Sequence, residues 1–257
     1  MTAALEQLED RSSFWKERFS RHPINWPELR GQMELGLSKL MAFELERDAA
    51  GGPYIVLGNE TQIQFYGDTY GVTCPLMTHW FRRSITRRGA WCGHGPAMLL
   101  DTGTMERSRV GSHDAIVLAG ATAIHELAHF VVWRFRWGKF KPKSSGKQMA
   151  TYLESPVADA EIQPISLRTE HDIHFLRIAL HASYRADLMV YDCLKHGARD
   201  LIDWDSIAPS GALAYGRALS TEFDELIGVP LSQIKLHPIS ERFSELWNHD
   251  GVMLNAV

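Results

Sequence analysis

The chain has 257 residues, of which 45% are hydrophobic, and it carries a formal net charge of −4. This length allows one large domain or two small ones, and the composition is that of a globular protein. The small negative charge excludes a general attraction to nucleic acid or to membrane surfaces.

Targeting signals and cysteines indicate the compartment. We find no uninterrupted apolar run of about 18 residues, and the acidic N-terminus lacks a signal-peptide core. The three cysteines are scattered, which favours a reducing compartment over a disulfide framework. We therefore expect a cytoplasmic protein without a membrane contact; the sequence does not predict its oligomeric state.

The chain is predicted to have three parts. Apolar residues recur at helical spacing over residues 3–20 and again over 28–47, and a Gly-Gly-Pro run ending at Pro53 then marks a boundary. Two further helices are predicted near 212–227 and 239–247. The parts are an N-terminal helical extension (1–50), a catalytic body (51–190) and a C-terminal helical extension (191–257).

Short strand-like runs follow the boundary. Residues 54–57 and 62–66 are rich in β-branched and aromatic side chains, and 84–92 with 97–100 resemble a hairpin. An exposed edge of this hairpin could pair with an extended peptide substrate, and an ordinary sheet strand fits the pattern equally well.

The most specific pattern is His-Glu-x-x-His, formed by His125, Glu126 and His129 inside an almost uncharged stretch that predicts a buried helix. Residues four apart share one helix face, so both imidazoles can bind one metal ion. Glu126 lies about 100° further round the helix and can reach a water molecule on that ion. A chance match is the alternative, but burying these three polar groups is costly unless they are paired or metal-bound.

A catalytic zinc ion usually has three protein ligands. The candidates for the third are His171, His174, Glu154 and Glu170. The two histidines lie one turn apart at the start of a helix predicted over 172–186, and other zinc peptidases use a glutamate placed like Glu154. The residues alone leave this choice open.

The stretches 122–131 and 170–180 together resemble the SprT-like metallopeptidases, in which a second helix opens with a His-Gly-x-x-Phe-like motif. The resemblance implies a zinc-dependent (Zn2+) peptidase in which His171 joins His125 and His129 as metal ligand and Glu126 is the catalytic base. This chain differs from the pattern at Asp172, where glycine is usual. It also has a longer gap between the motifs and no cysteine zinc ribbon after them.

Residues 133–147 contain six basic and four aromatic side chains. A solvated loop whose aromatic side chains belong to the core is the favoured interpretation of this composition. A nucleic-acid contact is the alternative, and it is compatible with the SprT-like resemblance because such relatives often act on DNA-bound proteins.

We therefore expect an α+β, zincin-like fold, with a small sheet packed on the buried helix and extra helices at both ends. The expected function is peptide-bond hydrolysis by a metal-activated water. Tyr184 or Arg177, on the same helix as His171, could assist, but nothing in the sequence selects either. The alternatives are a zinc hydrolase acting on another bond and a binding or regulatory protein on the same scaffold.

Overall fold

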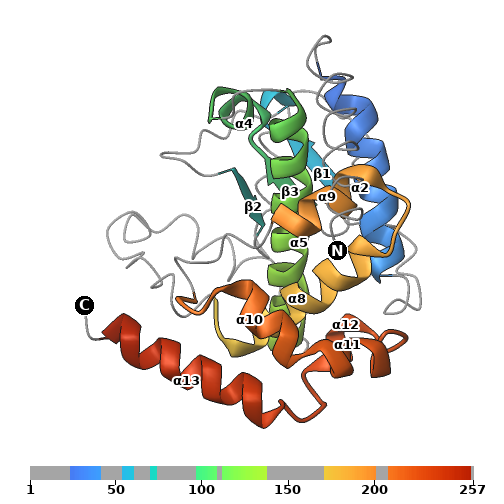
Figure 1. Ribbon diagram of the computed structural model, residues 1–257. Helices are drawn as coiled ribbons and strands as arrows, with labels where there is room; N and C mark the ends of the chain where they lie inside the picture. Colours follow the sequence, from blue (N-terminus) through green and yellow to red (C-terminus); the bar gives the residue numbers. More distant parts are fainter. Residues whose placement is uncertain are drawn as a thin grey trace, which may run out of the picture.

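The computed structural model describes residues 24–41, 54–60, 70–73, 97–108, 112–137, 171–200 and 208–255. Its described part is α+β, as predicted: a three-stranded sheet accompanied mainly by helices (Figure 1). Several predicted features lie outside the described residues: the helix over 3–20, the strands over 62–66 and 84–92, the candidate ligands Glu154 and Glu170, and residues 138–147 of the basic stretch.

The helices are α2 (Trp26–Met41), α4 (Thr102–Ser108), α5 (Ser112–Trp137), α8 (Ile173–Asp187), α9 (Asp192–Asp200), α10 (Gly211–Ala218), α11 (Ser220–Glu225), α12 (Leu231–Ile234) and α13 (Glu241–Asn255). The strands are β1 (Tyr54–Leu57), β2 (Gly71–Thr73) and β3 (Ala97–Leu100), and a 3-10 turn, η1 (Gly58–Glu60), follows β1. The helix predicted over 172–186 is confirmed as α8. The one predicted over 212–227 is two helices, α10 and α11.

The sheet has the order β1-β3-β2, with β1 parallel and β2 antiparallel to β3. All four residues of β3 are buried. Strand β3 pairs with β1 along one edge and with β2 along the other. The prediction that residues 97–100 pair with 84–92 in a hairpin is therefore wrong. For the same reason, β3 offers no exposed edge to a substrate.

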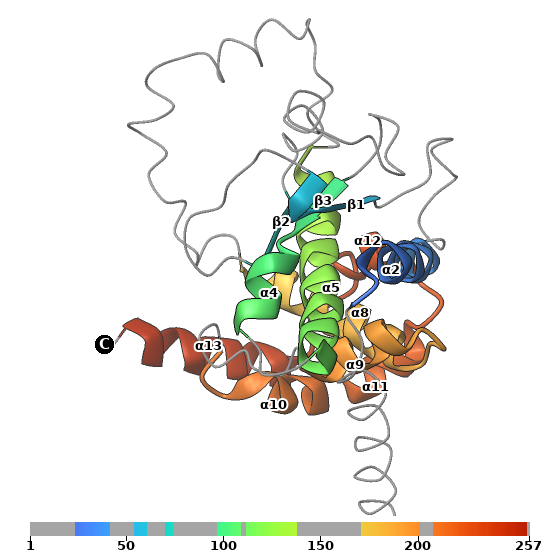
Figure 2. The same cartoon turned by 90° about the horizontal axis from the view of Figure 1, so that it is seen from above.

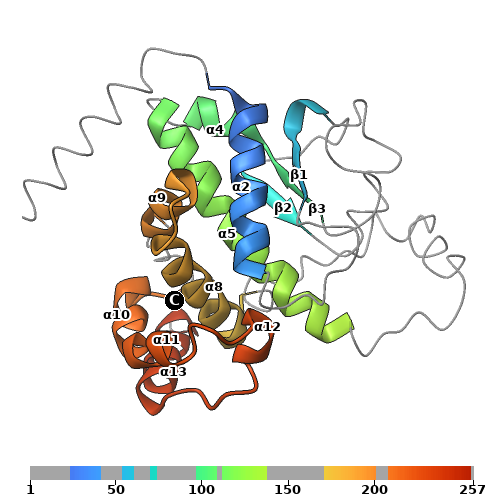
Figure 3. The ribbon, with the colours of Figure 1, turned by 90° about the vertical axis from the view of Figure 1, so that its right-hand side faces the viewer.

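Helix α5 lies between the sheet on one side and α8 and α9 on the other, with α2 flanking it (Figures 2 and 3). Apolar residues on every side of α5 are buried, which confirms the predicted buried helix. By length and composition alone, the segment Asp114–Val132 could cross a membrane, but 83% of it is buried inside the protein. Burial of this extent is that of a core helix in a soluble protein.

Helix α8 is bonded to the C-terminal helices by two buried arginines. The Arg177 guanidinium donates to a carboxylate oxygen of Glu222 and to the carbonyl oxygens of His237 and Pro238. Arg185 donates to the carbonyl oxygens of Leu226 and Val229. These bonds cross the boundary predicted at residue 190, so α8 and the segment after α10 share one polar interface.

Candidate metal centre

Two of the three predicted metal ligands are positioned by helix α5 alone. His125 and His129 lie one turn apart on the same face, and their Nε2 atoms are 3.1 Å from each other. The helix forms because its apolar side chains are buried all round; this burial carries His129 into the interior and leaves His125 partly buried.

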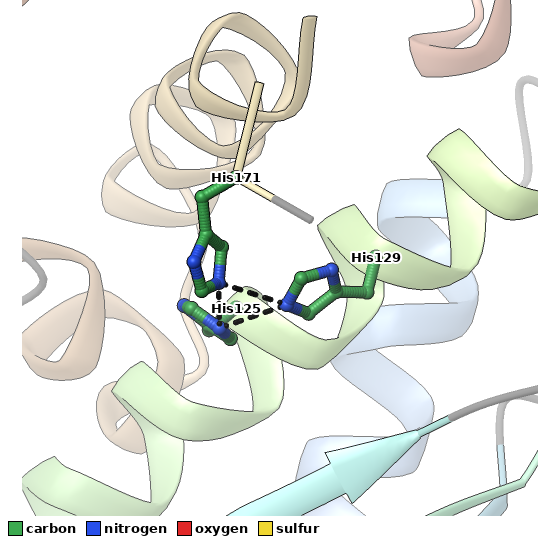
Figure 4. A group of neighbouring side chains, drawn as sticks. All are labelled: His125, His129 and His171. Carbon is green, nitrogen blue, oxygen red and sulfur yellow. Dashed lines mark hydrogen bonds between the residues drawn. The ribbon is translucent and has the colours of Figure 1, made fainter. Parts of the chain in front are cut away.

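His171 reaches the same point from the other side. It directly precedes Asp172, the N-cap of α8. Its Nε2 atom lies 3.2 Å from that of His125 and 3.1 Å from that of His129. Figure 4 shows the three rings turned so that their Nε2 atoms converge. Among the described residues, this is the one group of histidine, cysteine and acidic side chains close enough to hold a metal ion.

Hydrogen bonds alone cannot satisfy this triangle of nitrogens. An imidazole nitrogen either carries a proton and donates, or carries a lone pair and accepts. Among three nitrogens in mutual contact at least two are of the same kind, so one contact must join two donors or two acceptors. A cation bound by three lone pairs removes this conflict because all three nitrogens then have the same role.

The spacing of the triangle also fits a transition-metal ion. Zinc binds histidine nitrogen at about 2.0–2.1 Å, and tetrahedral angles then separate two ligand nitrogens by about 3.4 Å. The observed separations of 3.1 and 3.2 Å are within a few tenths of an ångström of that value. The donor set and its size therefore fit a transition-metal ion such as zinc.

The electrostatics of the site favour neutral imidazoles, the form that binds metal. Burial, followed by the neighbouring His171, lowers the pKa of His125 to about 3. Burial, followed by the two neighbouring histidines, lowers the pKa of His129 to about 2. At neutral pH both rings are uncharged, and their lone pairs are available to a cation.

Phe175 forms an apolar platform beneath the triad. Its ring is fully buried, and its centroid lies 5.1, 4.2 and 4.6 Å from those of His125, His129 and His171. The phenylalanine of the His-Gly-x-x-Phe-like motif falls on Phe175, so the resemblance contained a signal that this residue belongs with His171.

The predicted base, Glu126, is 5% exposed and follows His125 on α5. It is not one of the three grouped ligands, which agrees with its place on a neighbouring face of the helix. The Glu126 side chain is thus largely shielded from bulk solvent.

The other predicted candidates lie elsewhere or are engaged elsewhere. His174 is on α8 but does not belong to the group of three histidines that could hold a metal ion. Arg177 is fully buried and bonded to the C-terminal segment, so the suggestion that it assists at the metal is wrong. Tyr184 donates its hydroxyl hydrogen bond to Asp224.

Comparison of the chain with models of known protein families, with curated proteins and with solved structures finds no match in any of the three.

Proposed function

We propose that this protein is a zinc-dependent metallopeptidase with a zincin-like, SprT-like active site. The observation that carries the proposal is the convergence of three histidine Nε2 atoms, two from a His-Glu-x-x-His helix and one from the start of a second helix. This is the ligand number of a catalytic zinc site.

In this proposal His125, His129 and His171 hold the ion, and Phe175 keeps their rings together. A zinc ion held there would supply Lewis acidity and would lower the pKa of a water molecule towards about 7. Glu126 would be the general base that accepts a proton from the attacking water and returns it to the leaving amine.

The sheet offers one edge that could align an extended peptide. The edge of β1 is occupied, because the N–H groups of Ile55 and Leu57 donate to the carboxylates of Glu34 and Glu60. The outer edge of β2 meets no further strand among the described residues. Strand β2 also lies against α5: a Cβ added to Gly71 would be 2.4 Å from the methyl carbon of Thr122. Thr122 lies on α5 one helical turn before Glu126. These contacts support a peptide bound along β2.

Contact with nucleic acid through residues 133–147 is a separate proposal that rests on composition. If it holds, charge reversal of Lys139, Lys141 and Lys143 abolishes DNA binding, and the affinity of the wild type falls steeply with salt. Binding that ignores salt would contradict it.

Elemental mass spectrometry of the purified protein tests the metal site. We expect about one zinc per chain in the wild type and in His174→Ala, the matched control from the same helix. His129→Ala and His171→Ala should lose the metal, and Glu154→Ala should keep it. Loss in Glu154→Ala with retention in His171→Ala would assign the third ligand to the glutamate. A wild type that binds no zinc even after addition of the ion would remove the proposal.

A peptide library and a panel of other amides and esters then separate a peptidase from another hydrolase, because the metal site determines the attacking water and not the substrate. Turnover of a non-peptide substrate alone would favour the second class. Stoichiometric zinc without any turnover would favour a binding protein.

A further inference from the structure

The three candidate ligands are not held in the same way. His125 and His129 belong to a continuous helix, so their separation follows from helix geometry. His171 stands before the first residue of α8, where the chain has not yet become helical. Its position therefore depends on the path by which the backbone enters α8.

Two groups of Asp172, its carboxylate and its backbone carbonyl, fix that path by accepting hydrogen bonds from the first turn of α8. The Asp172 side chain accepts a hydrogen bond from the Phe175 N–H at 2.8 Å, and its carbonyl oxygen accepts one from the Leu176 N–H at 3.0 Å. Its backbone is extended, with φ −74° and ψ 175°. These are the features of an N-cap, which satisfies first-turn N–H groups that have no partner inside the helix.

The cap acts on both sides of the site. The Asp172 carboxylate accepts a hydrogen bond from the backbone N–H of Phe175. The ring of Phe175 in turn packs against all three imidazoles. The backbone of Asp172 is joined directly to His171. One hydrogen bond therefore ties the residue that presents the third nitrogen to the residue that supports the rings.

We propose that Asp172 is a positioning residue, whose cap holds His171 in place for the metal ion before the ion arrives. This inference rests on the proposed metal site. It gives a role to the position at which the chain differs from the SprT-like pattern. Groups outside the ligand set that orient metal ligands typically contribute about 10- to 100-fold to metal affinity.

The test compares zinc dissociation constants, measured by competition with a chromophoric chelator. Asp172→Ala removes the acceptor and should weaken zinc binding about 10- to 100-fold. Asp172→Asn keeps a side-chain oxygen at the same place and should stay within about threefold of the wild type. The visible absorption of bound Co2+ should change in the alanine variant and be restored in the asparagine variant, because the band reports ligand geometry.

The matched control is Ser240→Ala. The Ser240 hydroxyl accepts from the Phe243 N–H at 3.2 Å at the start of α13, so this variant loses a cap of the same kind away from the triad. It should lower the melting temperature and leave the zinc affinity unchanged. If Asp172→Ala is poorly folded, Asp172→Ser, with a shorter acceptor, replaces it and should show an intermediate loss.

The outcomes separate the two proposals. Zinc affinity in Asp172→Ala equal to that of the wild type would overturn the positioning role and leave the metal site standing. An equal loss of affinity in Ser240→Ala would also overturn it, because general stability would then explain the effect. A wild type without zinc would overturn the metal site itself.

Discussion

Gly120 of α5 and Gly197 of α9 meet where the two helices cross, so closely that a Cβ on Gly197 would lie 2.4 Å from the carbonyl carbon of Gly120. The same Cβ would lie 2.3 Å from the backbone nitrogen of Ala121. The obstructing atoms belong to the backbone of a buried helix, which cannot move aside as a flexible side chain could. The crossing lies on the same helix as His125 and brings α9 against the core.

We predict that Gly197→Ala lowers the free energy of unfolding by about 2–3 kcal/mol, since overpacking must separate the two helices. Urea denaturation measures the change. Gly216→Ala is the control: Gly216 is inside α10, and nothing lies within 4 Å of an added Cβ. The control should be neutral or more stable by about 0.5–1 kcal/mol. Equal effects at both positions would contradict the close crossing.

The bonds of Arg177 predict a large loss of stability when its charge is removed. Arg177→Met leaves the partly buried carboxylate of Glu222 and two carbonyl oxygens without this donor. Breaking a buried ion pair from one side typically costs about 3–5 kcal/mol. The control is Arg199→Met, which breaks an exposed pair with Asp187 and should cost less than about 1 kcal/mol. Chemical denaturation of both variants checks the contrast.

The His181–Glu222 contact predicts that stability falls in acid. Burial lowers the pKa of His181, although the hydrogen bond to Glu222 opposes the shift. Burial alone would raise the pKa of Glu222, but bonds from His181 and Arg177 outweigh it and hold the pKa below its usual value. Both folded-state pKa values lie below the unfolded ones, so the unfolded state binds more protons as the pH falls.

The stability that depends on His181 is therefore present above its unfolded pKa of about 6.5 and is lost below it, by up to about 1.4 kcal/mol per pH unit. The stability that depends on the Glu222 carboxylate is lost when the pH falls below its unfolded pKa of about 4.5. Urea unfolding of the metal-free protein between about pH 8 and 5 should show a shallower slope in His181→Gln than in the wild type. Identical slopes would mean that His181 titrates normally in the fold.

The proposed base makes a distinct prediction for Glu126→Gln. The amide has nearly the shape of the carboxylate but cannot take a proton, so the variant should keep its zinc and lose at least about 100-fold in turnover. Metal analysis and peptide cleavage are measured on the same preparation. A variant that cleaves at the wild-type rate would assign proton transfer to another group.

Local patterns in the sequence accounted for the helices that carry the site. Spacing of i and i+4 on a buried helix places His125 and His129 together without any knowledge of the rest of the fold. The arrival of His171 at the same point depends on how α8 packs against α5, and helical periodicity contains no information about that packing. Here the resemblance to a known family indicated the residue that the structure brings to the pair.

The two incorrect predictions, on strand pairing and on Arg177, also concern contacts between residues distant in sequence. The strand over 97–100 was predicted correctly, but its partners are β1 and β2, because strand pairing is decided by contacts distant in sequence. Arg177 was suggested as an active-site group because it lies on the helix that follows His171. Its partners come from residues 222–238, and no local pattern links those residues to α8.

The separation of His125 and His171 along the chain, 46 residues, has a consequence for the polypeptide between them. An ion bound to both would close that stretch into a loop, as a covalent cross-link does. Closing a loop of this length restricts the unfolded chain by an amount equivalent to about 4 kcal/mol in the chain-entropy description of cross-links. The ion would then tether two distant segments of the chain, and chelation would release the tether and empty the proposed metal site in one step.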